Sequence, residues 1–228
     1  MKWQALIDMA DLAIFDLDHT LIATDSADRW SVYMCENGMI QDTDAFLETH
    51  KKYEQRYKVG DIDMGEFIRF ALKPLIGLRE CDVTKKVIEF IEAFIRPHIY
   101  KKGVDVVRDH VEKGDTILLI SATIEDLVNP VGKILGFKPE NILAVNTEKC
   151  DERYTGNLLG TLGFGKGKVA RTQAWLQQQK LAFDKTYFYS DSINDLPLLL
   201  EVDEPRVVNP DPKLLIEAKN RGWFVKYF

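Results

Sequence analysis

The sequence predicts an α/β protein, in which a parallel β-sheet lies between two layers of helices and an all-helical cap is inserted into this three-layer core. Three observations lead to this prediction. Short, continuous apolar runs recur along the chain, amphipathic helical stretches separate them, and one long block shows no strand pattern. We therefore expect a core made of residues 1–25 and 97–228 and a cap made of residues 26–96.

Five apolar runs are the predicted strands of the core. They are continuous rather than alternating, which is typical of parallel strands because helices bury both faces of such a sheet. The runs are residues 12–15, 116–120, 142–145, 186–189 and 206–208. Strands separated by helices in this way indicate a Rossmann-like parallel sheet.

Four predicted helices alternate with these strands. Asp211 and Pro212 have the residue types of a helix N-cap and first turn, and Gly222 is a typical stop. The helices are centred on the apolar stripe Val104, Val107 and Val111, on residues 125–135, on residues 168–180 and on the segment from Asp211 to Gly222.

Residues 26–96 interrupt the alternation and show helical patterns only. Asp63 and Glu66 have the spacing of a capping box, which marks the start of one helix inside the block. Arg96 precedes Pro97, and the residue before a proline is pushed out of helical geometry, so the block ends there. Its frequent aromatic side chains are interpreted as the core of the cap itself.

The charge balance excludes several kinds of partner. The chain has 228 residues and a formal net charge of −6, and it contains no run of Lys and Arg. Nucleic acid and anionic membrane surfaces are therefore poor candidate partners. An anionic substrate would also be repelled by the average surface, so any phosphate site must supply positive charge locally.

Cysteine usage and hydropathy favour a soluble protein of the cytoplasm. Cys35, Cys81 and Cys150 are odd in number and far apart, which fits reduced thiols better than disulfides. The N-terminal segment becomes acidic too early for a signal peptide. No apolar run reaches the ~18 residues that a membrane-spanning helix needs.

Two carboxylates follow the first predicted strand directly. Asp16 and Asp18 are two residues apart, so they project to one side while the chain stays extended. Ligands of open parallel sheets bind at the carboxyl ends of the strands, where these residues lie. At ~4 Å and an effective dielectric of ~20, two such charges repel by on the order of 4 kcal/mol. A divalent cation removes this cost, and Mg²⁺ is the usual choice beside phosphate.

A second acidic turn follows the strand at residues 186–189. Asp191 can bind a metal ion directly, whereas Asn194 and Asp195 can orient its waters or hold a lysine. An isolated turn of this composition would be read as a helix cap. Together with two carboxylates at the end of another strand, it predicts a metal site.

Candidate phosphate ligands occur at two further places. Ser121, Ala122 and Thr123 end the second strand and open a helix, where a hydroxyl and free N–H groups form an anion site. Lys168 lies in a glycine-rich turn before a helix and can neutralise both phosphate and a nucleophilic carboxylate. Lys166 competes for this role, and we favour Lys168 because it starts the helix.

These motifs, taken in order, resemble the haloacid dehalogenase superfamily of phosphatases. The pattern consists of Asp-x-Asp-x-Thr-Leu, a serine ending the second strand, a lysine before a helix, and a final Asp-x-x-x-Asp. It is most similar to the phosphoserine-phosphatase-like branch, whose helical cap follows the first motif. The turn expected at Tyr154, Thr155 and Gly156 also resembles that branch, and the likeness extends over essentially the whole chain.

The resemblance implies the chemistry of the first motif. Asp16 would be the nucleophile that forms a phospho-aspartate, and Asp18 would be the general acid and base. Mg²⁺ would be bound by Asp16, the carbonyl of Asp18 and Asp191.

The resemblance also implies how phosphate is held. Ser121, with its neighbour Ala122, and Lys168 would bind the phosphate oxygens, and Asn194 and Asp195 would support them.

The substrate prediction is a small phosphorylated metabolite that carries an amine. Phosphoserine phosphatases typically have glycines where this chain has Ala122 and Thr123, so it resembles histidinol-phosphate phosphatases more closely. Asp25 lies where the branch places an acidic residue that contacts the substrate's amino group, although it could simply cap the first cap helix. Contacts of His19 or Arg56 with the substrate stay open.

Two other functions use the same fold. A phosphotransferase or mutase would pass the phosphate to another acceptor, and Asp18 argues against this because it supplies the base that favours hydrolysis. A non-catalytic phospholigand-binding protein would be marked by loss of Asp16 or Asp18, and both are present. Fold alone does not identify the substrate, the pathway or the oligomeric state.

Overall fold

The computed structural model describes residues 10–59, 61–180 and 182–228. Residues 1–9, which were predicted to begin the core, therefore lie outside the described residues. The prediction that no signal peptide is present concerns the same segment. No helix within the described ranges is both long and apolar enough to cross a bilayer.

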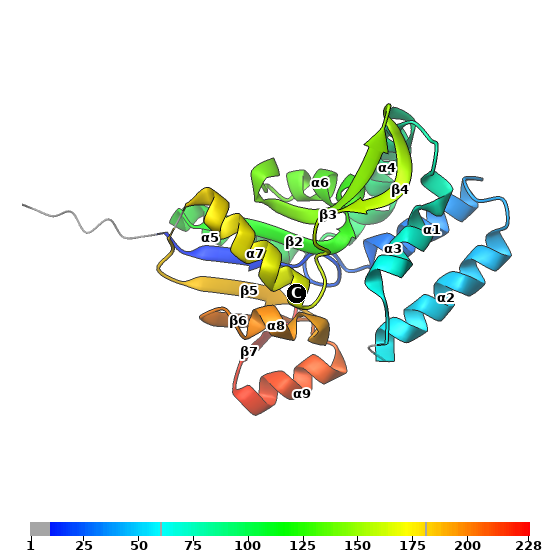
Figure 1. The fold of residues 1–228 in the computed structure, drawn as a ribbon. Helices are drawn as coiled ribbons and strands as arrows, with labels where there is room; N and C mark the ends of the chain where they lie inside the picture. Colours follow the sequence, from blue (N-terminus) through cyan, green and yellow to red (C-terminus); the bar gives the residue numbers. More distant parts are fainter. Residues whose placement is uncertain (1–9, 60, 181) are drawn as a thin grey trace, which may run out of the picture.

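A seven-stranded sheet forms the centre of the molecule, in the order β4-β3-β2-β1-β5-β6-β7 (Figure 1). All neighbouring strands are parallel except β3 and β4, which are antiparallel. The strands are β1 Leu12–Phe15, β2 Thr116–Ile124, β3 Ile142–Cys150, β4 Arg153–Leu159, β5 Thr186–Ser190, β6 Glu204–Val208 and β7 Phe224–Lys226. The predicted α/β fold with a parallel sheet is confirmed.

Three details of the strand prediction were wrong. Tyr154, Thr155 and Gly156 form part of β4 rather than a turn, and β7 was not predicted. The second strand does not end at Ser121, because β2 continues to Ile124 before the next helix begins. The pairing of β2 with β3 is irregular between Ile120 and Ile124, so this end of the strand departs from regular sheet geometry.

Helices cover both faces of the sheet. Alternate residues of β1 face opposite sides: Ala13 and Phe15 belong to one apolar cluster, and Leu12 and Ile14 to the other. The first cluster contains α5 Lys101–Lys113 and α6 Glu125–Ile134 together with the cap. The second contains α7 Lys166–Gln179, α8 Leu196–Leu199 and α9 Pro212–Arg221. Single 3₁₀ turns occur at Pro139–Asn141 (η4) and Ile193–Asp195 (η5).

The block predicted as a cap is helical and stands beside the carboxyl ends of the central strands (Figure 1). Its aromatic side chains pack on one another: the Trp30 ring lies 5.2 Å from Phe90, and Phe46 lies 4.7 Å from Phe70. The elements are α1 Ser26–Glu36, α2 Thr43–Val59, α3 Met64–Leu72, η1 Lys73–Leu75, α4 Glu80–Phe90, the π-helical turn η2 Ile91–Ile95 and the 3₁₀ turn η3 Arg96–His98.

Backbone hydrogen bonds fix the helical block at two places. Just outside the block, Ala23 N–H donates to the His98 carbonyl over 2.7 Å and joins the segments that lead into and out of it. At its other side, Glu80 N–H donates to the Glu152 carbonyl (2.7 Å) and Gly77 N–H to the Tyr154 carbonyl (2.9 Å). The β3–β4 hairpin therefore holds the start of α4 against the core.

Candidate active site

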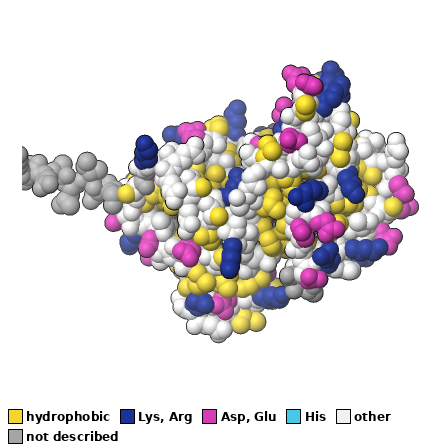
Figure 2. Space-filling view, viewed as in Figure 1, with side chains coloured by type: hydrophobic (Ala, Val, Ile, Leu, Met, Phe, Trp, Pro, Cys, Tyr) yellow, Lys and Arg dark blue, Asp and Glu magenta, His cyan; other side chains and the backbone are white. Residues whose placement is uncertain are grey.

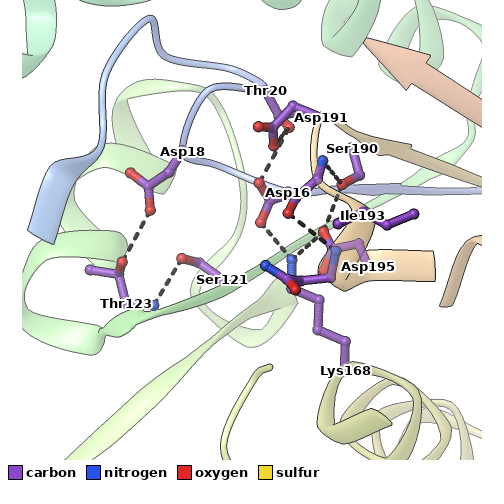
Figure 3. Close-up of polar contacts among 12 residues, drawn as sticks. Asp16, Asp18, Thr20, Ser121, Thr123, Lys168, Ser190, Asp191, Ile193 and Asp195 are labelled. Atoms are coloured by element: carbon purple, nitrogen blue, oxygen red, sulfur yellow. Dashed lines mark hydrogen bonds and ion pairs between the residues drawn. The ribbon is translucent and has the colours of Figure 1, made fainter. Parts of the chain in front are cut away.

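The predicted site residues lie at the carboxyl ends of the three central strands. Asp16 directly follows β1, Ser121 lies in the irregular last part of β2, and Asp191 directly follows β5. Because β1 pairs with both β2 and β5, the three segments meet at one edge of the sheet (Figure 3). Parallel topology thus brings together residues that are distant in the sequence.

A buried lysine connects two of the carboxylates. Lys168 Nζ donates to Asp16 Oδ1 over 2.6 Å and to Asp195 Oδ2 over 2.7 Å, and all three side chains are buried. Burial alone would lower the pKa of Lys168, but the two carboxylates outweigh this effect and raise it. The Lys166 side chain is exposed instead. The structure thus places Lys168, and not Lys166, beside the candidate nucleophile.

The loop before α7 reaches the site because it contains glycine. A Cβ atom at Gly163 would collide with the carbonyl oxygen of Ser121, so this loop can lie against β2 only without a side chain there. Lys168 then follows in the first turn of α7, which begins at Lys166. One glycine of the predicted glycine-rich turn therefore serves close backbone packing.

Thr20 joins the first and last motifs. Its hydroxyl lies 3.2 Å from Asp16 Oδ2 and 3.2 Å from Asp191 Oδ1, so the single hydroxyl hydrogen can bond either oxygen. Burial raises the pKa of Asp191 well above its usual value, and repulsion by Asp16 and Asp195 adds to this. Burial likewise raises the pKa of Asp16 to about 7, against the opposing effect of Lys168. The sequence placed Thr20 in the motif but assigned it no role.

The donor set suits magnesium. Three carboxylates, those of Asp16, Asp191 and Asp195, meet here with one lysine, and burial of this excess negative charge favours a bound cation. Among the described residues, no three His, Cys, Asp or Glu side chains are arranged to hold a metal ion by themselves. Mg²⁺ usually binds to one or two carboxylates and completes its shell with water and substrate phosphate. Asp16 and Asp191 therefore fit this ion as its two carboxylate ligands.

Asp18 faces away from this cluster and is bound at both oxygens. Oδ1 accepts from the Ser26 N–H over 2.7 Å, and Oδ2 accepts from the Thr123 hydroxyl over 3.0 Å (Figure 3). Burial raises the pKa of Asp18 to about 6, and repulsion by Asp25 contributes. A carboxyl group with this pKa can give up and regain a proton near neutral pH.

The residues predicted to support the site interact as follows. Asp195 accepts a hydrogen bond from the Ser190 hydroxyl over 2.7 Å in addition to its bond with Lys168. Asn194 lines the cavity together with Tyr57 from the cap. The sequence missed Ser190 and Tyr57. A serine directly after an apolar run and one tyrosine among many carry no distinctive signal.

A cavity of about 650 Å³ lies between the carboxyl ends of the strands and the cap. It is lined by the candidate catalytic residues and by apolar and acidic side chains from the cap and from the segment that leads into it. The apolar group comprises Trp30, Ile62, Met64, Phe67, Ile68, Ala71 and Leu72, and the acidic group comprises Asp25, Asp28 and Glu54. Some of the aromatic residues predicted to form only the core of the cap thus also face the cavity.

The sequence left the roles of three residues open, and the structure places these residues at different positions relative to the cavity. Asp25 lines the cavity and also caps α1, where its side chain accepts from the Asp28 N–H over 2.9 Å. His19 lines the cavity as well. Arg56 is absent from the described lining, and its guanidinium lies 3.7 Å from Glu66. The geometry therefore supports both interpretations of Asp25 and places Arg56 away from the site.

Comparison with known proteins identifies the family. Residues 13–200 match the haloacid dehalogenase-like hydrolase family. A histidinol-phosphatase of Neisseria meningitidis serogroup C (strain 8013) is 40% identical over 224 residues, which cover 96% of this chain and 100% of that protein.

Two solved structures have the same fold. A protein of unknown function from Bordetella pertussis Tohama I superposes with a TM-score of 0.89 at 36% identity, over 95% of this chain and 98% of that one. A substrate-bound phosphoserine phosphatase superposes with a TM-score of 0.68 at 17% identity, over 95% of this chain and 92% of that one. The chain belongs to the haloacid dehalogenase-like hydrolase family, and within it to the phosphatases of the phosphoserine-phosphatase-like branch.

Proposed function

We propose that this phosphatase hydrolyses a small, amine-bearing phosphomonoester through a phospho-aspartate on Asp16, with Mg²⁺ as cofactor. One observation carries the proposal: Asp16 lies at the end of the central strand with Lys168 Nζ 2.6 Å from one carboxylate oxygen. The second oxygen lies 3.2 Å from the Thr20 hydroxyl, which is also 3.2 Å from Asp191 Oδ1. A nucleophilic carboxylate is thereby oriented beside both a fixed cation and an all-oxygen metal site.

In the first half of the reaction, an Asp16 oxygen attacks phosphorus and the bond from phosphorus to the leaving oxygen breaks. Asp18 gives its proton to that oxygen, so that the alcohol leaves neutral and Asp18 becomes a carboxylate. Its pKa of about 6 places this proton within reach near neutral pH.

In the second half, water attacks the phosphorus of the acyl phosphate and Asp18 takes a proton from that water. The bond between Asp16 and phosphorus breaks, inorganic phosphate leaves, and both carboxyl groups return to their starting states. Mg²⁺, when bound, would neutralise charge on the transferring phosphoryl group.

Phosphate oxygens would be held by Ser121, the backbone at Ala122 and Lys168, with Asn194 at the edge of the site. All four residues line the cavity, and Ser121 and Lys168 are buried. Asp195 would keep Lys168 in place, because it contacts the ammonium group over 2.7 Å. These donors supply the local positive charge that the acidic chain otherwise lacks.

The acidic lining of the cavity supports an amine-bearing substrate. Asp25, Asp28 and Glu54 belong to this lining. Among the described lining residues, the cap contributes neither Lys nor Arg, and the two lysines of the lining, Lys168 and Lys213, come from the core. This favours an amino alcohol phosphate such as histidinol phosphate over phosphoserine, as does the histidinol-phosphatase relative.

The test compares phosphate release from three phosphomonoesters that differ in their amine and carboxylate groups. We expect kcat/KM to fall in the order histidinol phosphate, phosphoserine, and an alkyl phosphate without an amine. Asp25→Ala should narrow the gap between amine-bearing and amine-free substrates, because the carboxylate that attracts the ammonium is gone. Equal preferences in wild type and variant would remove Asp25 from substrate recognition. Phosphate that appears on an added alcohol rather than in water would favour a phosphotransferase.

We also propose that the enzyme works in the cytoplasm. Cys35, Cys81 and Cys150 carry free thiols in the structure, which suits a reducing compartment. On the face drawn in Figure 2, acidic and basic side chains are interspersed, and no single basic area covers it. This supports the expectation that nucleic acid is not a partner. Fractionation of cells that express the tagged protein would test its location.

A further inference from the structure

Thr123 contacts Asp18, the proposed acid and base. The Thr123 hydroxyl donates to Asp18 Oδ2 over 3.0 Å, and its side chain is buried while lining the cavity. It belongs to the Ser121, Ala122, Thr123 segment, which forms the irregular end of β2. This chain therefore places a hydroxyl within hydrogen-bond distance of the acid.

Thr123 is itself held in position. Its backbone N–H donates to Ser121 Oγ over 3.1 Å (Figure 3). This hydrogen bond fixes the backbone at the irregular end of β2, where Thr123 lies. A β-branched side chain has few χ1 rotamers, so the hydroxyl has little freedom once the backbone is set. The donor is thus pre-oriented toward Asp18 by local structure.

The two partners of Asp18 differ in what they can do. The Ser26 N–H, 2.7 Å from Oδ1, can only donate a hydrogen bond. The Thr123 hydroxyl can donate to a carboxylate and can also accept from a protonated carboxyl group. The contact at Oδ2 can therefore persist while Asp18 changes between its two protonation states, whereas the contact at Oδ1 favours an oxygen without a proton.

We propose that Thr123 is a positioning residue that holds Asp18 in place through both halves of the reaction. The inference rests on the role of Asp18 in the proposed function. As the leaving oxygen takes the proton of Asp18, the Thr123 hydroxyl donates to the carboxylate that forms. As Asp18 later takes a proton from water, the same hydroxyl keeps the plane of the carboxyl group. Thr123 exchanges no proton with the substrate.

Leaving-group dependence separates this role from a purely structural one. An alkoxide leaves poorly and needs a proton, whereas 4-nitrophenolate leaves well without one. The ratio kcat/KM covers only the steps up to departure of the leaving group, so the later hydrolysis does not enter. We expect Thr123→Val to lower kcat/KM for histidinol phosphate on the order of tenfold, as for loss of a hydrogen bond to a charged group. For 4-nitrophenyl phosphate the loss should be at most about twofold, well below that value.

Three further variants complete the experiment. Thr123→Ser keeps the hydroxyl and should restore most of the activity toward histidinol phosphate. Thr20→Val removes a buried hydroxyl that contacts Asp16 and Asp191, so it should slow both substrates alike. Asp18→Asn should show a stronger leaving-group dependence than Thr123→Val. Thermal unfolding shows whether each variant folds. If Thr123→Val does not fold, Thr123→Ala takes its place and is compared with Thr123→Ser.

The outcomes separate the two proposals. Equal losses on both substrates for Thr123→Val, or a serine variant no better than valine, would overturn the role of Thr123. If Asp18→Asn itself showed no dependence on the leaving group, the assignment of Asp18 would fail first. If the loss of kcat/KM depended on the leaving group in Asp18→Asn but not in Thr123→Val, the proposed function would stand and only the role of Thr123 would be rejected.

Discussion

The charged side chains of the site can be buried only because they are paired with one another. Lys168 would be costly to bury alone, as would Asp16 or Asp195, yet the three form hydrogen bonds of 2.6 and 2.7 Å inside the protein. The Lys168 ammonium also lies 5.6 Å from the Phe188 ring, on the strand next to β1. Removal of the lysine leaves the two carboxylates as buried charges without compensation, whereas removal of the Asp16 charge leaves Lys168 paired with Asp195.

Lys168→Met should therefore lose both activity and stability. We expect a loss of about 3–5 kcal/mol in the free energy of unfolding, as for other broken buried ion pairs. Denaturant unfolding measures this loss directly. Lys166→Met is the matched control, since the Lys166 side chain is exposed two positions earlier on the same helix, and it should change little. A large effect of Lys166→Met alone would reverse the assignment.

Asp25 should show the opposite behaviour because its carboxylate is unfavourable in the folded state. Burial raises the pKa of Asp25 from 3.8 to about 6, and repulsion by Asp28 adds to it. The folded protein then binds this proton more tightly than the unfolded chain, so Asp25 costs stability as the pH rises from about 4 through 6.

Asp25→Asn should thus stabilise the protein by about 1–2 kcal/mol at pH 8 and by almost nothing at pH 4. Asparagine is also a good N-cap, so α1 keeps its start. Unfolding by urea at the two pH values measures the difference. A stabilisation that does not depend on pH would show that the charge of Asp25 is not its cause.

Individual elements were predictable where one signal dominated. The strands at β1, β2 and β5 are continuous apolar runs, and the structure confirms them. The hairpin that adds β4 was missed because its turn carries no sequence signal. Asp151 and Glu152 both have positive φ, 48° and 60°, a combination that usually requires glycine or asparagine.

The same turn offers a test at this scale. Glutamate in left-handed geometry costs roughly 1–2 kcal/mol, which glycine avoids at some cost in backbone entropy. We expect Glu152→Gly to raise the free energy of unfolding by about 0.5–1 kcal/mol without changing kcat/KM. The hydrogen bond from Glu80 N–H to the carbonyl of residue 152 uses the backbone and should persist. A destabilised variant would mean that the turn is not strained.

At the scale of the whole molecule, topology assembles what the sequence keeps apart. The order of β2, β1 and β5 explains why four separate motifs meet, and the sequence was sufficient to predict this meeting. It could not show the contact between Thr123 and Asp18, because this contact depends on the irregular end of β2. It also could not show the acidic lining of the cavity, because this depends on how the cap sits on the core. The division at residues 25 and 97 stays a prediction.

Metal dependence also belongs to this scale, since the ligands come from two strands. Activity should disappear with a chelator and return with Mg²⁺, while Ca²⁺ restores little because it prefers more ligands and longer bonds. Titration of chelated protein with each ion, followed by phosphate release, measures this. Full activity after exhaustive chelation would rule out the arrangement proposed for Asp16 and Asp191.

The central claim is that phosphate passes through Asp16. The most direct measurement is acid quenching during turnover, followed by borohydride reduction, which converts a phospho-aspartate but not aspartate into homoserine, and by mass analysis of the peptides. We predict homoserine at position 16 in the wild type. Asp16→Asn should show neither homoserine nor turnover, while its thermal unfolding stays near that of the wild type. Homoserine at another position, or an Asp16→Asn variant that keeps a tenth of wild-type activity, would contradict the account.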